Sequence, residues 1–283
     1  MKRISIKVIL ANLVFSSIMY SQVESVDKCG YIYGDQPYHL LARTANWGYG
    51  YDSLLVDLVR WGASPFVTVD SLGASIQDRA LWELTIADNP QSSSNHRIYI
   101  HARTHPGEEE SFWVTNEIIN FLISDRPLAA FIRSNCIFHI IPMYNPDGVE
   151  LGYSRENANG VDIESGWDDV PLELEVAVLR NRFIELTSLV NNPIKMALNM
   201  HSSYSCKRYF VYHDAAGTSE DYTILEQQFI NGVQSYFPEG FEDWDYFVSW
   251  TSGTPGQYPE SWWWMNHGEN VMALTYEDMN CEA

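Results

Sequence analysis

The sequence has 283 residues, of which 46% are hydrophobic and 19% are charged. A chain of this length and composition can bury a substantial core, which excludes a disordered tail and a collagen-like repeat. Its 37 acidic residues outnumber the 17 lysines and arginines and give a formal net charge of -20. Because such a chain repels phosphate backbones, we expect no nucleic acid among its partners.

The first residues have the pattern of a secretory signal peptide. Lys2 and Arg3 precede a mainly apolar segment over residues 4–20, and polar residues follow it. A membrane anchor is the alternative, but the segment is short for a span and no basic cluster comes after it. The sequence therefore predicts a signal peptide over residues 1–22, a secreted or periplasmic location, and no stable membrane insertion once the signal is removed.

The cysteines show no CxxC spacing, which argues against a structural zinc site of the ribbon kind. They stand at Cys29, Cys136, Cys206 and Cys281. Export would permit disulfides, and the sequence alone does not choose among the possible pairings.

Residues 23–283 are predicted to form one domain, because no repeat, low-complexity linker or further membrane-length apolar run divides them. In chain order, the hydrophobic periodicity predicts a helix over 51–61, strands over 66–69, 81–86 and 98–100, a helix over 109–123, a strand over 137–141, a helix over 172–190, strands over 196–200 and 209–212, a helix over 220–237 and a strand over 271–275. This alternation is typical of an α/β sheet covered by helices. Ligand sites of such sheets gather at the carboxyl ends of strands.

A histidine and a glutamate three residues apart, His105 and Glu108, follow the strand predicted over 98–100. The Pro106-Gly107 turn between them can bend both side chains onto one cation, whereas a straight strand would point them to opposite faces. The alternative is that Glu108 only places negative charge at the start of the next helix.

His201 follows the strand predicted over 196–200, where a single histidine is more often a hydrogen-bonded core residue than a ligand. Together, however, His105, Glu108 and His201 form the two-histidine, one-carboxylate set of a catalytic zinc site with a position left for water. Glu277 follows the last predicted strand and can take a proton from that water, although alone it would be a surface residue.

At this point an ordered series of motifs resembles the zinc metallocarboxypeptidases, which include the pancreatic and the cytosolic carboxypeptidases. The segments that carry the likeness are 51–55, 71–75, 79–81, 103–108, 145–149, Arg155, 160–162, His201 and Glu277. The resemblance implies a single mixed β-sheet flanked by helices, and one zinc ion bound by His105, Glu108 and His201. It also implies that Glu277 is the general base and that Arg155 polarises the scissile carbonyl and stabilises the oxyanion.

The chain departs from the family pattern just after Asp162. Where the family has an Asn and an Arg that hold the terminal carboxylate of the substrate, this chain has Glu164 and Ser165. We predict that Arg155, Glu164 and Ser165 face the substrate, although Glu164 would repel a carboxylate. The alternatives are a substrate whose end is amidated, cationic or uncharged, or a carboxylate bound by another cation. The candidate cations are Arg103, Lys207 and Arg208, and the candidates for the mobile tyrosine of the family are Tyr246 and Tyr258.

The sequence therefore predicts an exported zinc metallocarboxypeptidase, a hydrolase that cuts the C-terminal amide bond of a peptide or peptide-like substrate through a zinc-activated water. One alternative is a zinc amidase or deacylase that acts on a cell-wall stem peptide or an acylated amino acid. The other is a non-catalytic binding protein that retains the metal.

Overall fold

The computed structural model describes residues 48–189, 191–203, 208–236, 247–248 and 256–279. The chain from Gly48 to Asn280 forms one compact unit. Residues 1–22 lie outside the described part, as does residue 23, so the domain boundary placed there stays a prediction. No helix among the described residues combines the length and the apolar character that a bilayer crossing requires.

Helices and strands alternate along the described chain, and every predicted element is present with its ends shifted by a few residues. The elements are α3 (Tyr51–Gly62), β1 (Val67–Ala74), β2 (Ala80–Ile86), β3 (His96–Ala102), α4 (Glu109–Leu122), α5 (Pro127–Asn135), β4 (Cys136–Ile141), α6 (Pro146–Leu151), α7 (Leu174–Thr187), β5 (Ile194–Ser203), β6 (Tyr209–His213), α8 (Glu220–Tyr236), β7 (Phe247–Val248), α9 (Pro259–His267), a 3-10 turn η1 (Gly268–Asn270) and β8 (Met272–Met279). The periodicity did not predict α5, α6 and α9, which are short and each begin at a proline.

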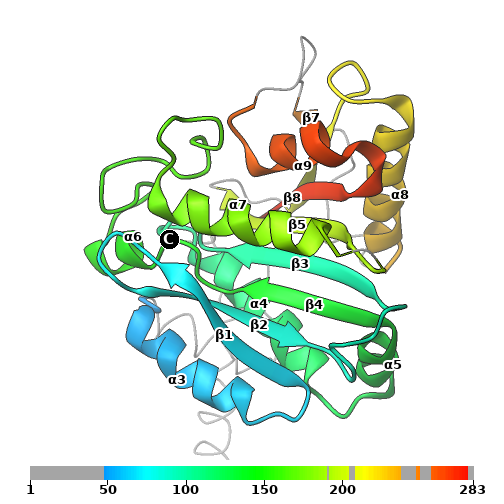
Figure 1. Ribbon diagram of the computed structural model, residues 1–283, viewed down its shortest axis with the longest axis horizontal. Coiled ribbons are helices and arrows are strands. Elements are labelled where there is room, and N and C mark those ends of the chain that lie inside the picture. Colours follow the sequence, from blue (N-terminus) through cyan, green and yellow to red (C-terminus); the bar gives the residue numbers. More distant parts are fainter. Residues whose placement is uncertain (1–47, 190, 204–207, 237–246, 249–255, 280–283) are drawn as a thin grey trace, which may run out of the picture. The chain divides into compact units, whose positions relative to one another are not determined.

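The strands form one mixed sheet in the order β1-β2-β4-β3-β5-β8-β6-β7 (Figure 1). The four central strands β4, β3, β5 and β8 run parallel to one another. The pairs β1-β2, β2-β4 and β6-β8 are antiparallel. Because the parallel strands end at the same edge of the sheet, the residues that follow or end them are brought together there.

Helices cover both faces of the sheet, and each face has its own hydrophobic core. On one face α3, α4 and α8 pack against side chains such as Ile100 of β3 and Leu274 of β8. On the other face α7 and α9 pack against their strand neighbours, Tyr99 and Ala273. Helix α7 lies in front of the sheet and α4 behind it in Figure 1. Successive side chains of a strand point to opposite faces of the sheet, and here both sets of side chains are buried. Both faces of the sheet therefore have to be covered by helices.

Candidate active site

Three segments bring the predicted metal ligands together at the carboxyl edge of the parallel strands. His105 lies on the loop after β3, Glu108 directly precedes α4, and His201 stands near the end of β5. The loop turns tightly, because the Glu108 amide donates to the carbonyl of His105 at 3.1 Å. The amide of Gly107 donates to the carbonyl of Ser154 at 3.0 Å, which ties this loop to the chain before Arg155.

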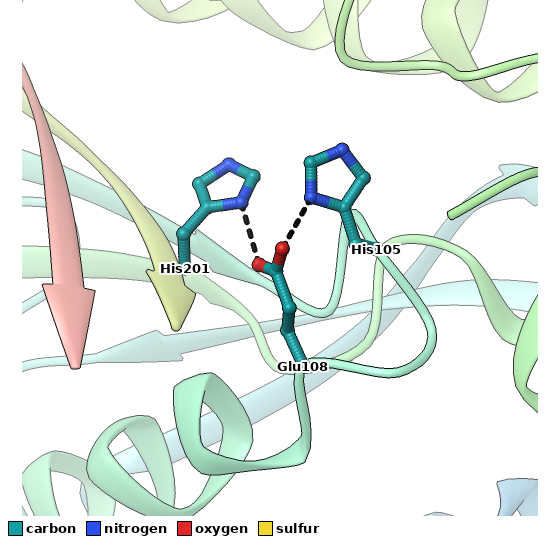
Figure 2. Close-up of side chains that lie close together, drawn as sticks. All are labelled: His105, Glu108 and His201. Atoms are coloured by element: carbon teal, nitrogen blue, oxygen red, sulfur yellow. Dashed lines mark hydrogen bonds and ion pairs between the residues drawn. The ribbon is translucent and has the colours of Figure 1, made fainter. Parts of the chain in front are cut away.

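The ligand atoms of His105, Glu108 and His201 all lie within 4.8 Å of one another (Figure 2). Nδ1 of His105 is 2.7 Å from Oε1 of Glu108, and Nδ1 of His201 is 2.8 Å from Oε2. The backbone amide of Ser202 also donates to Oε2, at 3.1 Å. Two imidazole nitrogens and a carboxylate directed at a common point are the donors that zinc prefers. The residues present therefore fit a zinc ion.

The charges of this cluster also suit a cation. Although burial opposes its ionisation, the two neighbouring imidazoles hold the pKa of Glu108 well below its usual range. Burial likewise opposes a charge on His105 and His201, yet the adjacent carboxylates raise the pKa of both. The carboxylates around the two imidazoles thus favour positive charge at this position, and a bound divalent cation would supply that charge.

A carboxylate lies at the far nitrogen of each imidazole. Oδ1 of Asp162 is 3.2 Å from Nε2 of His105, and Oε2 of Glu164 is 3.3 Å from Nε2 of His201. Asn199 on β5 donates to both oxygens of Glu164, at 3.1 Å each. The first contact is a hydrogen bond that orients the ring of His105 with Nδ1 toward the metal position, and the second is an ion-pair contact that places a carboxylate beside the ring of His201. These contacts were not predicted from the sequence, where the only signal is two carboxylates two residues apart, Asp162 and Glu164.

Glu277 stands beside His201, because β5 and β8 pair with these two residues in register. Its atom Oε2 is buried and has no hydrogen-bond partner among the described residues. Burial, reinforced by two nearby carboxylates, raises the pKa of Glu277 to about 7 despite the neighbouring imidazole. A carboxylate with such a pKa can both accept and return a proton near neutral pH.

Arg155 lies at the edge of the same site, and its side chain is half exposed. Its guanidinium donates two hydrogen bonds to Oδ2 of Asp162, at 3.2 and 3.0 Å, and lies 3.9 Å from Glu108. The structure therefore holds a cation next to the cluster, where a substrate oxygen can reach it.

A cavity of about 390 Å³ joins these residues. Its described lining includes His105, Glu108, Arg155, Glu164, His201, Tyr258, Glu260 and Glu277. Ser165 is not among the lining residues of the described chain; its amide instead closes a turn on the carbonyl of Asp162 at 3.2 Å. Its predicted contact with the substrate stays a prediction.

The other cations considered for the terminal carboxylate are placed differently. The buried guanidinium of Arg103 donates to the carbonyl of Pro106 at 2.7 Å and so supports the ligand loop from within. Arg208, directly before β6, forms an ion pair with Asp278. Lys207 and Tyr246 lie outside the described residues.

Known proteins resemble this chain in sequence and in fold. The family model for zinc carboxypeptidases matches residues 56–277. Cytosolic carboxypeptidase 6 of Mus musculus is 43% identical over 103 residues, which are 35% of this chain and 19% of that protein. Cytosolic carboxypeptidase 6 of Caenorhabditis elegans is 32% identical over 195 residues, 60% of this chain and 42% of that protein. The solved structure of a metallo-carboxypeptidase from Burkholderia cenocepacia matches with a TM-score of 0.69 and 20% identity, over 82% of this chain and 60% of that chain.

These relatives correct one prediction. The secreted or periplasmic location, with a signal peptide over residues 1–22, is wrong, because the curated proteins that match are named cytosolic carboxypeptidases. The physical reason for the error is that a short apolar segment after two basic residues is not specific to export. The chain spans about a fifth or less of the length of the first of these relatives.

The match to the family model covers more than half of the chain and includes every residue of the cluster described above. It confirms the predicted use of one zinc ion as cofactor, and the mixed α/β fold is confirmed by the solved carboxypeptidase structures. The chain belongs to the zinc carboxypeptidase family.

Proposed function

We propose that this chain is a zinc-dependent carboxypeptidase that hydrolyses the C-terminal amide bond of peptides. The observation that supports this most strongly is the convergence of Glu277 with the cluster of His105, Glu108 and His201 on one cavity. The names of the relatives favour peptide hydrolysis in the cytosol. Neither the amidase nor the binding-protein alternative gains support from these relatives.

The residues divide the reaction between them. A zinc ion held by His105, Glu108 and His201 would polarise the peptide carbonyl and lower the pKa of the attacking water. Glu277 takes a proton from that water and then gives it to the leaving amine, which its pKa of about 7 permits. Arg155 donates hydrogen bonds to the carbonyl oxygen as negative charge develops there. Asp162 holds Arg155 in this position through its two hydrogen bonds.

The test compares the wild type with Glu277→Gln on a diverse peptide mixture with free and amidated C-termini, followed by mass spectrometry. We expect stepwise loss of C-terminal residues from the wild type. Glu277→Gln should retain its zinc and lose turnover by a factor of about 10³ or more, because it cannot move the proton. The matched control is Glu117→Gln, at an exposed position on α4. Near-normal turnover in Glu277→Gln would remove this residue from the role of base.

A further inference from the structure

A second cavity, of about 290 Å³, lies apart from the active site. It is bounded by strands β1 to β4, by the loop before β3 and by the end of α7, and none of its described lining residues lines the active-site cavity. Three basic side chains line it: Arg97, His139 and Arg182. Arg97 is the second residue of β3, whereas the ligand loop follows the last residue of that strand, about 16 Å further along. The two cavities are therefore at opposite ends of β3.

The guanidinium of Arg182 is already engaged by two carboxylates. Its Nε and one terminal nitrogen donate to the two oxygens of Glu83, at 2.9 and 2.6 Å, and the other terminal nitrogen donates to Glu185 at 2.9 Å. Glu83 is only 1% exposed, whereas the side chain of Glu185 is 65% exposed. Inside the protein the charges of Arg182 and Glu83 therefore balance each other, and water screens the charge of Glu185.

The imidazole of His139 is neutral. Its Nδ1 lies 3.0 Å from Oε1 of Glu83, and its Nε2 lies 2.7 Å from a terminal nitrogen of Arg97. Because a guanidinium can only donate, Nε2 accepts that hydrogen bond, and the ring proton stays on Nδ1 and is donated to Glu83. Burial, reinforced by the two neighbouring arginines, lowers the pKa of His139 despite its contact with Glu83. His139 thus adds no charge to the cavity, and it holds the guanidinium of Arg97 in place.

Arg97 carries a charge that no described residue balances. One terminal nitrogen is used on the neutral ring of His139, and the other is 3.5 Å from the carbonyl of Pro90. Its Nε is buried and has no hydrogen-bond partner among the described residues, and no carboxylate of the described chain forms an ion pair with this side chain. Burial and the like charge of Arg182 lower the pKa of Arg97. A half-buried cation without a counter-ion is unfavourable, and a bound anion would relieve that cost.

The acidic side chains of the cavity lie away from Arg97. Asp70 belongs to β1, and three strand spacings, about 14 Å, separate β1 from β3 in the sheet order. Glu185 pairs with Arg182 instead. Near Arg97 the wall is formed by Pro90, and its neighbour Gln91 also lines the cavity with an uncharged amide. This end of the cavity therefore offers positive charge and neutral polar groups.

We propose that this cavity binds a small oxyanion, a phosphate or carboxylate group, which Arg97 holds through charge-assisted hydrogen bonds. The cavity is close to the lower limit of small-molecule pockets, about 300 Å³, and suits such a group with a small organic part. Leu186 and Leu189 also line it and offer apolar contacts to that part. The site is separate from the proposed zinc site and does not depend on the proposed carboxypeptidase function.

The first test titrates inorganic phosphate and acetate calorimetrically into the zinc-loaded full chain, with chloride added to keep the ionic strength constant. We expect binding with a dissociation constant of about 1 mM, as for an anion held mainly by one guanidinium. Tighter binding of phosphate than of acetate identifies a phosphate group as the ligand, and the reverse order identifies a carboxylate group. If neither anion binds at about 20 mM, the inference is wrong.

The second test assigns the anion to Arg97. We expect Arg97→Gln to weaken the affinity for the anion at least tenfold, because a charged donor is lost. Arg60→Gln, which removes an exposed arginine of α3, is the matched control and should leave the affinity unchanged. Arg155→Gln should leave it unchanged as well. Loss of affinity in Arg155→Gln with none in Arg97→Gln would place the anion at the active site and overturn the inference.

A melting curve gives an independent readout. Phosphate at about ten times its dissociation constant should raise the melting temperature of the wild type by roughly 3–5 °C and leave that of Arg97→Gln unchanged. Equal shifts in the two proteins would contradict the assignment. If Arg97→Gln does not fold, a crystal structure of the wild type with phosphate decides: an anion beside Arg97 supports the site, and one found only elsewhere overturns it. None of these measurements reads peptide cleavage, so their failure leaves the proposed function untouched.

Discussion

At the scale of single residues, the carboxylates of Asp162 and Glu164 lie at the far nitrogens of the two metal-binding imidazoles. A carboxylate on the far nitrogen of a metal-binding histidine fixes the ring and makes its other nitrogen a better donor. Asp162 is held by Arg155, and Glu164 is held by both hydrogen bonds from Asn199. Neither carboxylate is free to turn away from its histidine. The Glu164 that replaces the expected asparagine thus has a structural use in this chain.

We expect Glu164→Gln to weaken zinc binding about tenfold, because an amide supports His201 less strongly than a carboxylate does. The measurement is the zinc dissociation constant from competition with a chelator. Glu117→Gln on exposed α4 serves as the control and should not change that constant. A dissociation constant that is the same in Glu164→Gln and the wild type would show that the contact with His201 does not support metal binding.

His101 of β3 is a buried histidine whose two ring nitrogens have no hydrogen-bond partner among the described residues. It lies between the rings of Tyr99 and Tyr144. Burial, with a smaller effect of the nearby His201, lowers the pKa of His101 to about 3. Its folded pKa is therefore below the unfolded value of about 6.5, so the unfolded state binds a proton first on acidification.

His101 should consequently make the fold sensitive to acid. Its contribution to stability is complete above pH 6.5 and falls by about 1.4 kcal/mol per pH unit between that pH and about 3. We expect His101→Leu to remove this part of the pH dependence and to cost little at pH 7, since no hydrogen bond is lost. Urea unfolding at pH 7, 6 and 5 measures the slope. An unchanged slope in His101→Leu, with His96→Leu at the exposed start of β3 as control, would contradict this assignment.

At the scale of elements, the short helix α6 holds the ligand loop in place. Asn145 caps this helix by accepting a hydrogen bond from the amide of Gly148 at 3.0 Å. Its side-chain amide also donates to the carbonyls of Thr104 and Glu156, at 3.1 and 3.2 Å, and thereby joins the segments that carry His105 and Arg155. A Cβ at Gly148 would collide with the carbonyl of Glu156 and with Pro106.

We therefore expect Gly148→Ala to lower the free energy of unfolding by at least about 2 kcal/mol and to weaken zinc binding, since the ligand loop must shift. Gly232→Ala is the matched control: this exposed glycine of α8 has open space around it. That change should instead raise stability by about 0.5–1 kcal/mol through helix propensity. Urea unfolding and chelator competition measure both effects. Equal stability of the two variants would mean that α6 does not need this close approach.

The sequence predicts a helix well when packing requires apolar residues to recur at the helical period. It predicts a helix poorly when the helix is only one or two turns long. Helices α4, α7 and α8 bury a repeating face, so their ranges are nearly those expected. Helix α6 has only six residues and its cap, and α9 buries Trp262 and Trp263 without a clear apolar face. Such short helices leave almost no periodic signal.

The contacts of the site also differ in how well the sequence predicts them. The convergence of His105, Glu108 and His201 was predictable because the turn after β3 and the end of β5 meet at one edge of a parallel sheet. The contact of Glu164 with Asn199 joins residues 35 apart through an irregular loop, and no local pattern encodes it. The position of Glu260 likewise depends on how α9 packs on β8.

At the scale of the whole molecule, the proposed zinc site joins segments that are distant in the sequence. His105 and Glu108 lie between β3 and α4, whereas His201 lies near the end of β5. Unfolding separates these ligands, so a bound ion stabilises the folded chain by mass action. Around the site the buried carboxylates repel one another, which should make the zinc-free protein the less stable form.

We expect free zinc at about a thousand times its dissociation constant to stabilise the protein by about 4 kcal/mol, which raises the melting temperature by roughly 10 °C for a domain of this size. The measurement is calorimetric melting with zinc and after chelation. Glu277→Gln keeps all three ligands and should show the same shift, whereas His201→Ala should show little or none because a ligand is missing. An equal zinc-induced shift in His201→Ala and the wild type would place the stabilising ion elsewhere, and the site would then have to be sought outside the ends of the parallel strands.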